Sequence, residues 1–423
     1  MSLYDSSQHS TAQHSTAQPE TRLNSTAKSR KPKVVITSLG RVNYFEWFLL
    51  GLYQLQEAGE ISLGFDMPLM NRLLFSIPVR GINKLRKIFI PDSYNMDGYI
   101  LFEDGSRKTF SVDSADAPYL FDEEKLNTCD AYFKVNCPSI LDEDSFALTD
   151  SIRIPWSDHK HVDNSLKRLT DRGERCFIAD LGQYIRKIFP LMQGPRSLSR
   201  GMSYALLKGG YSNYLQGRNL RKSKKFMCYF GNAQGPAPEK NVTHPDYDWE
   251  RDIMGYYAEQ VSHPNEKRAR IAEYLSGIGA EADARIISTS NADSGIRTNA
   301  ELIVPLKDFC RYISSFQYNF NVSGYRMSIP SRFIESFMVG TAIVTDKLVV
   351  RWYLPFDECE VFETVKMGYE RMEDVDWAQF ERDVMSLPET DPAKIVDCFN
   401  RKWAPEVVAR YIIDTVRQAG ETA

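Results

Sequence analysis

The stretch of sequence over residues 318–346 constrains the fold most. Tyr318–Val322 is rich in aromatic and β-branched residues, which is typical of a strand, and the short apolar run Thr341–Thr345 predicts a second strand. Between them the sequence predicts a polar glycine loop and a helix of about ten residues that ends at Gly340. A strand, a loop, a helix and a strand in this order predict a parallel α/β unit.

The start of this predicted helix carries residues suited to an anion. Pro330 fits a first helical turn, and the hydroxyls of Ser328 and Ser331 are expected to cap free backbone N–H groups. Arg332 adds a forked cation to the partial positive charge of the helix start, which favours a phosphate. Glu335 lies one turn further along the same side, placed to accept from ribose hydroxyls. A solvated Arg–Glu ion pair is the alternative interpretation.

This segment resembles the nucleotide-sugar site of GT-B glycosyltransferases, most closely that of the exostosin-like members. The residues that carry the resemblance are Gly324, Ser328, Arg332, Glu335 and the run Gly340–Asp346. The resemblance implies two Rossmann-like α/β domains that face a cleft, with C-terminal helices that cross back to the first domain. It also implies that Ser328, Arg332 and Glu335 hold the nucleotide of the donor.

A second glycine-containing segment is predicted to face the same crevice. Phe226–Phe230 reads as a strand and Gly231–Gly235 as the loop that follows it, which repeats the plan of the strand Lys33–Ser38 near the start of the chain. Ligands of doubly wound sheets lie beyond the carboxyl ends of the strands, so Gly231 becomes a donor-site candidate. A plain turn is the alternative. The aromatic segment Arg351–Asp357 is interpreted as a lid or a donor-side wall, or as ordinary packing.

Two further residues are candidates for the cleft. Asn43 follows the first strand, and Glu46 stands at capping-box spacing from it, so Glu46 is interpreted as a helix cap rather than a base. Lys134 lies in the predicted strand Ala131–Asn136, which resembles a Tyr-Phe-Lys strand near the cleft of bacterial relatives. The alternative is a lysine at a strand edge.

The sequence predicts two domains and a tail. A chain of 423 residues holds two or three cores at about 150 residues each. The predicted parts are a low-complexity tail over residues 1–31, an acceptor domain over 32–192, a linker over 193–225, a nucleotide-sugar domain over 226–390 and C-terminal helices over 391–423. Strands and helices alternate, which predicts parallel sheets, while Gly98–Phe102 and Arg107–Val112 flank an Asp–Gly turn typical of a β-hairpin.

Composition and motif searches narrow the function classes. A net charge of −4 creates no general field for polyanions, so nucleic acid is not an expected partner. The seven cysteines are widely spaced and predict neither a disulfide framework nor a zinc ribbon, which fits a reducing cytoplasm. The histidines have no nearby carboxylates at catalytic metal spacing, and three Asp-x-Asp triplets follow no convincing buried strand, so we expect no metal and no cofactor besides the donor. The absence of a long apolar run and of a signal peptide predicts at most peripheral membrane contact.

The expected activity is therefore metal-independent transfer of a sugar from a nucleoside-diphosphate donor to a glycan, lipid-linked or protein acceptor. A nucleotide-sugar epimerase and a non-catalytic nucleotide- or glycan-binding protein remain alternatives. The sequence does not identify the donor base and sugar, the acceptor, the catalytic base, the stereochemical course, the oligomeric state or the role of the tail.

Overall fold

The structure, a computed structural model, describes the residues that position the site. They are 31–40, 42–76, 94–115, 120–138, 176–177, 181–195, 198, 201–218, 220, 225–233, 267–278, 281–288, 306–322, 328–346, 348, 350–365 and 376–420. All of them belong to one compact unit, Lys31–Ala423. The predicted tail, apart from Lys31, and the candidate Gly324 lie outside the described residues.

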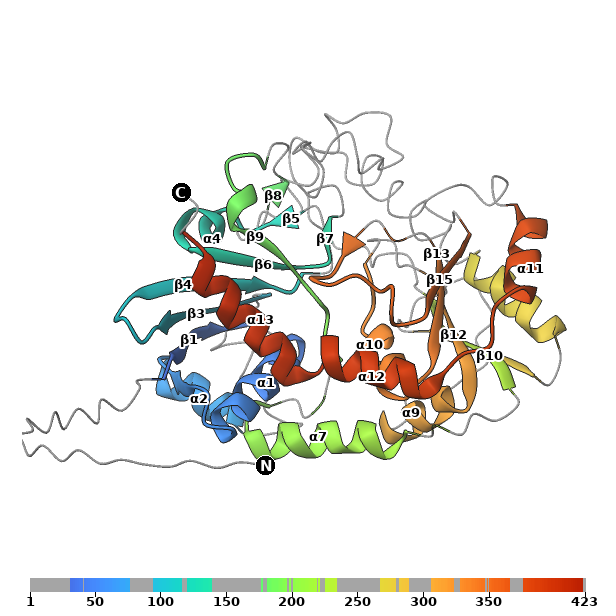
Figure 1. Cartoon of the computed structure of the whole chain (residues 1–423), viewed down its shortest axis with the longest axis horizontal. Coiled ribbons are helices and arrows are strands. Elements are labelled where there is room, and N and C mark those ends of the chain that lie inside the picture. The colour runs from blue at the N-terminus through green and yellow to red at the C-terminus, as the bar shows by residue number, and fades with distance from the viewer. Residues whose placement is uncertain are drawn as a thin grey trace, which may run out of the picture. The chain divides into compact units, whose positions relative to one another are not determined.

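The second half of the chain forms a five-stranded sheet in which every pairing is parallel (Figure 1). Its strands are β10 (Lys225–Ala233), β11 (Ala282–Ser288), β12 (Phe316–Asn321), β13 (Ala342–Asp346) and β15 (Val361–Val365). They lie in the order β11-β10-β12-β13-β15, so the direction of strand succession reverses between β10 and β12. In sheets of this kind the crevice at the carboxyl ends of those two strands is where ligands bind.

Helices connect these parallel strands. They are a helix over residues 267–277, α9 (Leu306–Ser314), α10 (Arg332–Met338) and, after β15, α11 (Trp377–Met385). The order β12–α10–β13 confirms the strand–helix–strand unit expected over residues 318–346. Helix α10 has 7 residues, fewer than expected, and Gly340 ends it with a φ of +70°. A Cβ there would also lie 2.7 Å from the Pro392 carbonyl oxygen, so glycine is required twice over.

The expected hydroxyl caps of α10 are not confirmed at Ser331. Ser331 is the N-cap residue, but its backbone is itself in the helical region and its side chain makes no capping hydrogen bond. The backbone turn begins at Pro330, whose carbonyl accepts from Phe333 N–H at 3.2 Å. The opposite end of α10 is held by Arg218, whose Nε donates to the Met338 carbonyl at 2.7 Å.

The first half of the chain forms a six-stranded mixed sheet. Its strands are β1 (Lys33–Leu39), β2 (Ser62–Phe65), β3 (Asn95–Leu101), β4 (Arg107–Asp113), β6 (Ala131–Val135) and β9 (Ile188–Leu191), in the order β2-β1-β3-β4-β6-β9. The predicted β-hairpin is confirmed as β3–β4, with Gly105 in its turn at a φ of +86°. Because this hairpin makes β3 antiparallel to both neighbours, the prediction of a parallel sheet is wrong for this half.

Helices and short segments complete the first half. They are η1 (Val42–Tyr44), α1 (Glu46–Glu57), α2 (Leu69–Ser76), α4 (Glu123–Thr128), η3 (Ile185–Lys187), α7 (Tyr204–Gln216) and the two-residue strands β5 (Leu120–Phe121) and β8 (Cys176–Phe177), which pair with each other. The predicted capping box is wrong, because the N-cap of α1 is Phe45 and carries no side-chain cap. Glu46 is instead buried and accepts from the Gly201 N–H at 3.1 Å.

The last two helices, α12 (Pro392–Lys402) and α13 (Pro405–Gln418), contact both halves of the chain. Helix α12 packs on α10, and α13 runs against α1 so closely that a Cβ at Gly51 would lie 2.0 Å from the Pro405 carbonyl oxygen. The Tyr411 hydroxyl donates to the Pro190 carbonyl of β9 at 2.9 Å. Pro405 opens α13, a position that proline favours because a first helical residue needs no N–H donor.

A disulfide joins Cys359, just before β15, to Cys398 in α12. The sequence predicts no disulfide, because 39 residues separate the two cysteines and no spacing pattern pairs them. The fold brings their Cα atoms to 5.6 Å, within the range that a disulfide needs. Cys129, Cys137, Cys228 and Cys310 are buried and take part in no disulfide.

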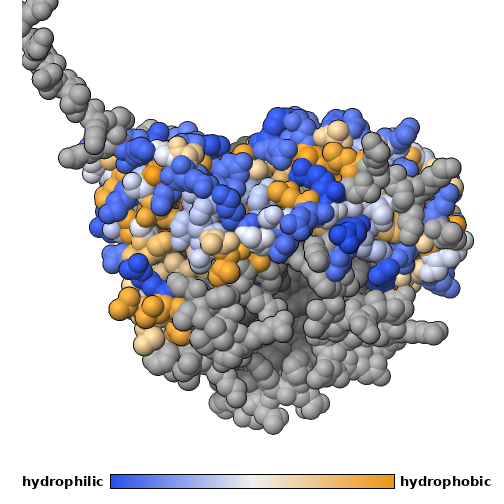
Figure 2. Space-filling model, turned by 90° about the horizontal axis from the view of Figure 1, so that it is seen from below, coloured by the Kyte–Doolittle hydropathy of each residue, from blue (hydrophilic) through white to orange (hydrophobic). Residues whose placement is uncertain are grey.

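The described helices are all too short or too polar to cross a bilayer. Exposed apolar side chains gather on α2, where Leu69 is 69%, Met70 51% and Leu73 49% exposed. On the face shown in Figure 2, hydrophobic and hydrophilic residues are interspersed in small groups.

Candidate functional site

The candidate site lies at the carboxyl ends of β10 and β12. Tyr229, in the middle of β10 and level with Phe320 near the end of β12, is fully buried, and burial raises the pKa of its phenol to about 12. The positive charges of Arg268 and Arg332 lower the pKa of the same phenol, whereas the negative charge of the Asp346 carboxylate raises it. The Tyr229 hydroxyl neighbours the Arg268 guanidinium but makes no hydrogen bond of good geometry to the described residues. A buried hydroxyl in this state costs free energy unless a ligand satisfies it.

Arg332 and Arg268 bring two positive charges into this buried region. Arg268 is buried in the first turn of the helix over residues 267–277, and Arg332 is half-buried in the first turn of α10. Burial lowers the pKa of Arg332, and the like charge of Arg268 lowers it further, while Tyr229 and Glu335 raise it. Arginine side chains are effectively always protonated in proteins. Two cations in mutual repulsion favour the binding of an anion near them.

Glu335 faces the interior, one turn along α10 from Arg332. It is only 8% exposed, and its Oε1 accepts from the Tyr214 hydroxyl of α7 at 3.3 Å. Burial raises the pKa of Tyr214 well above its ordinary value, and the charge of Glu335 adds to that shift. Because Glu335 is buried, a solvated surface ion pair with Arg332 does not describe it.

The loop before α10 is held by the first sheet. Ile329 N–H donates to Oδ1 of Asn136 at 3.1 Å, and Asn136 follows β6 with a left-handed φ of 57°. Next to it, β7 (Cys137–Pro138) pairs antiparallel with β14 (Val350–Arg351), which precedes β15. Ser328 and Ser331, both half-buried, therefore lie in a segment that the end of β6 positions.

Lys134 of β6 is fully buried, and its Nζ donates to Asp113 Oδ2 at 2.8 Å. The alternative of a strand-edge lysine is wrong, because β6 lies between β4 and β9. Asp113 Oδ2 also accepts from the Tyr132 hydroxyl at 2.6 Å, and Asp113 Oδ1 accepts from the Ala115 N–H at 2.9 Å. Lys134 is thus part of a buried polar cluster at the ends of β4 and β6.

The two remaining candidates, Asn43 and Gly231, lie in a short helix and in a strand, respectively. Asn43 lies half-buried in η1, directly after β1. Gly231 is not in a loop, because β10 continues to Ala233 and Gly231 pairs with Ile286 of β11. The prediction that the strand stops at Phe230 is therefore wrong, since the neighbouring strand extends the ladder through the glycine.

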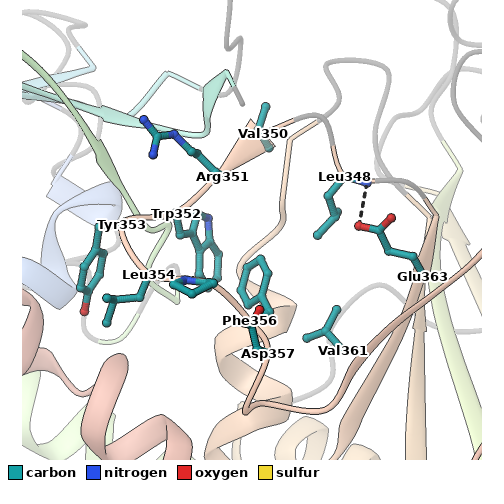
Figure 3. Close-up of a pocket in the computed structure, with 11 residues that line it drawn as sticks. Leu348, Val350, Arg351, Trp352, Tyr353, Leu354, Phe356, Asp357, Val361 and Glu363 are labelled. Atoms are coloured by element: carbon teal, nitrogen blue, oxygen red, sulfur yellow. Dashed lines mark hydrogen bonds between the residues drawn. The ribbon is translucent and has the colours of Figure 1, made fainter. Parts of the chain in front are cut away.

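A cavity of about 610 Å³ lies in the segment between β13 and β15 (Figure 3). It is lined by Leu348, Val350, Arg351, Trp352, Tyr353, Leu354, Pro355, Phe356, Asp357, Val361 and Glu363. The segment Arg351–Asp357, interpreted from the sequence as a lid or a wall, thus forms most of its lining. Its inner wall packs against α10: the Phe333 ring contacts Trp352 and Phe356 at centroid distances of 6.0 and 5.7 Å.

Sequence reasoning missed Tyr229 and Arg268. The only local signal for Arg268 is a basic pair, Lys267 and Arg268, at the start of an amphipathic helix, and such pairs are usually solvated. Both residues are buried here. Among the residues that the structure describes, no group of three or more histidine, cysteine or acidic side chains could hold a metal ion.

No protein-family model matches the chain, and no curated protein matches it either. The functional argument therefore depends on the fold and on the geometry of this site.

Proposed function

We propose that the protein is a glycosyltransferase of the GT-B type, which moves a sugar from a nucleoside-diphosphate donor to a glycan, lipid-linked or protein acceptor. The observation that carries the proposal is the placement of the buried Arg268 and the half-buried Arg332 around the Tyr229 hydroxyl at the reversal point of a parallel sheet. Such a position binds anionic ligands in many α/β proteins.

In this proposal the donor diphosphate lies between the two guanidinium groups. Negative charge develops on the leaving diphosphate as the bond to the sugar breaks, and Arg268 and Arg332 offset it. Glu335, one turn deeper, accepts from the ribose hydroxyls. The protein supplies this positive charge from its own side chains, in keeping with the metal-independent reaction expected from the sequence.

The two sheets correspond to the two domains of the proposed GT-B architecture. The first sheet and its helices form the acceptor side, and α13, which packs on α1, corresponds to the helix that crosses back. The contacts Ile329–Asn136 and β7–β14 support a cleft between the two sheets at this level. Closure of such a cleft excludes the water that would hydrolyse the donor.

Incubation with radiolabelled UDP-, GDP-, CMP- and dTDP-sugars tests the proposal. Slow release of free sugar from one donor, faster when an acceptor is added, is the expected result. An isomerised donor would instead indicate an epimerase, and binding without turnover would indicate a sensor. The Arg268→Ala protein should lose the donor reaction while it remains folded.

A further inference from the structure

The volume, the aromatic wall and the polar lining of the cavity beside α10 point to one class of ligand. Its volume of about 610 Å³ falls within the range of about 300 to 1,000 Å³ that is usual for small-molecule sites. Figure 3 shows Trp352 and Phe356 on one side of it, Leu348, Val361 and Glu363 on the other, and Arg351 at one end.

The apolar wall of the cavity is rigid. Trp352 is 2% exposed and its ring contacts Phe356 and Trp403 at a centroid distance of 5.2 Å in each case. Phe356 in turn packs on Phe333 and Phe337 of α10. Trp352 thus holds the half-buried Phe356 in place from behind, and Phe356 presents fixed aromatic surface to the cavity, which favours the apolar face of a ring over a flexible chain.

The carboxylates that line the same cavity form few hydrogen bonds or ion pairs with other described residues. Asp357 is exposed and forms no ion pair within the described part of the chain, and Glu363 makes one long hydrogen bond, 3.5 Å from its Oε1 to Leu348 N–H. Carboxylates accept from hydroxyls, so the lining matches a ligand with several hydroxyl groups.

The charges of the lining argue against an anion. Among the described lining residues, two carboxylates, Asp357 and Glu363, stand against one cation, Arg351, so a diphosphate would meet net repulsion from them. The candidate anion site with Arg268 and Arg332 has the opposite sign. The two sites therefore favour different parts of a substrate.

We propose that this cavity binds a neutral sugar ring, with its apolar face on Phe356 and its hydroxyls on Asp357 and Glu363. The role of that ring rests on the proposed function: it belongs either to the donor or to the acceptor. Sugar binding itself can be measured without any nucleotide, so its failure and the failure of the proposed function are distinguishable.

Saturation-transfer NMR on the full chain, with methyl α- and β-pyranosides of glucose, galactose, mannose and xylose as probes, tests the proposal. At least one glycoside should receive saturation, and Asp357→Asn should weaken its binding about tenfold because a charged acceptor is lost. Asp397→Asn is the matched control, since Asp397 is an exposed carboxylate on α12 that pairs with Arg401 at 2.8 Å. That variant should bind the glycoside as the parent protein does.

Competition experiments identify the source of the sugar. If a nucleoside-diphosphate sugar displaces the glycoside while UDP and GDP do not, the ring is that of the donor. If neither displaces it, the ring is that of the acceptor. The proposal is overturned if no glycoside binds, if Asp357→Asn binds as the parent protein does, or if uridine, guanosine, UDP or GDP displaces the glycoside.

Discussion

Arg332 and Arg268 are the residues on which donor binding depends in the proposed site. Arg332→Ala removes one of two cations, and we expect a loss of about 2 to 4 kcal/mol in transition-state stabilisation. The rate of donor turnover, compared at equal folded fraction, measures it. Arg401→Ala is the control, because Arg401 is an exposed arginine that pairs with Glu358 and Asp397 on the protein surface. Equal turnover by the parent and the Arg332→Ala protein would contradict the assignment.

Substitutions at Lys134 and Asp113 test whether their buried ion pair stabilises the first sheet. Lys134→Met leaves the Asp113 carboxylate buried without its 2.8 Å partner, and removal of one member of such a pair costs about 3 to 5 kcal/mol. Urea denaturation should show this loss in the free energy of unfolding. The double variant Lys134→Met/Asp113→Leu should recover part of it, because no charge is then left buried. A single variant as stable as the parent would show that solvent reaches the cluster.

At the scale of elements, close helix packing makes α1 and α13 sensitive to a single methyl group. Gly51→Ala places a Cβ 2.0 Å from the Pro405 carbonyl oxygen, so the two helices must separate. We expect a loss of about 1 to 3 kcal/mol, the usual cost of overpacking. Thermal unfolding measures this loss.

Gly209→Ala in α7 is the matched control for that substitution. A Cβ at Gly209 meets nothing within 4 Å, so the alanine should raise stability by about 0.5 to 1 kcal/mol through helix propensity alone. Opposite signs for the two substitutions are expected in the same unfolding assay. A stabilising Gly51→Ala would mean that α13 does not lie against α1 as described.

At the scale of the whole molecule, the Cys359–Cys398 disulfide ties the segment before β15 to α12. A crosslink across 39 residues removes conformational freedom from the unfolded chain, which corresponds to about 4 kcal/mol in the chain-entropy model. Dithiothreitol should therefore lower the unfolding midpoint of the parent protein. The Cys359→Ser/Cys398→Ser protein should unfold at the same midpoint with and without the reductant, and mass spectrometry under non-reducing conditions should detect the crosslinked peptide only in the parent.

The sequence-based predictions succeeded where the signals that they used act over a few neighbouring residues. The unit β12–α10–β13 and the hairpin β3–β4 were predictable because alternation of apolar residues, an Asp–Gly turn and Gly340 act locally. The parallel first sheet and the loop at Gly231 were mispredicted because strand pairing depends on neighbours distant in sequence. The capping role of Glu46 failed for a similar reason: its partner, Gly201, is 155 residues away.

By itself, the sequence determined the α/β character, the helix that carries Arg332 and Glu335, and its end at Gly340, because backbone preferences and hydrophobic period act over a few residues. Only the tertiary structure decided that Arg268 joins Arg332, that Lys134 pairs with Asp113 and that Cys359 meets Cys398. Each of these pairs joins separate elements, and such contacts exist only once strand order and helix packing have brought the elements together.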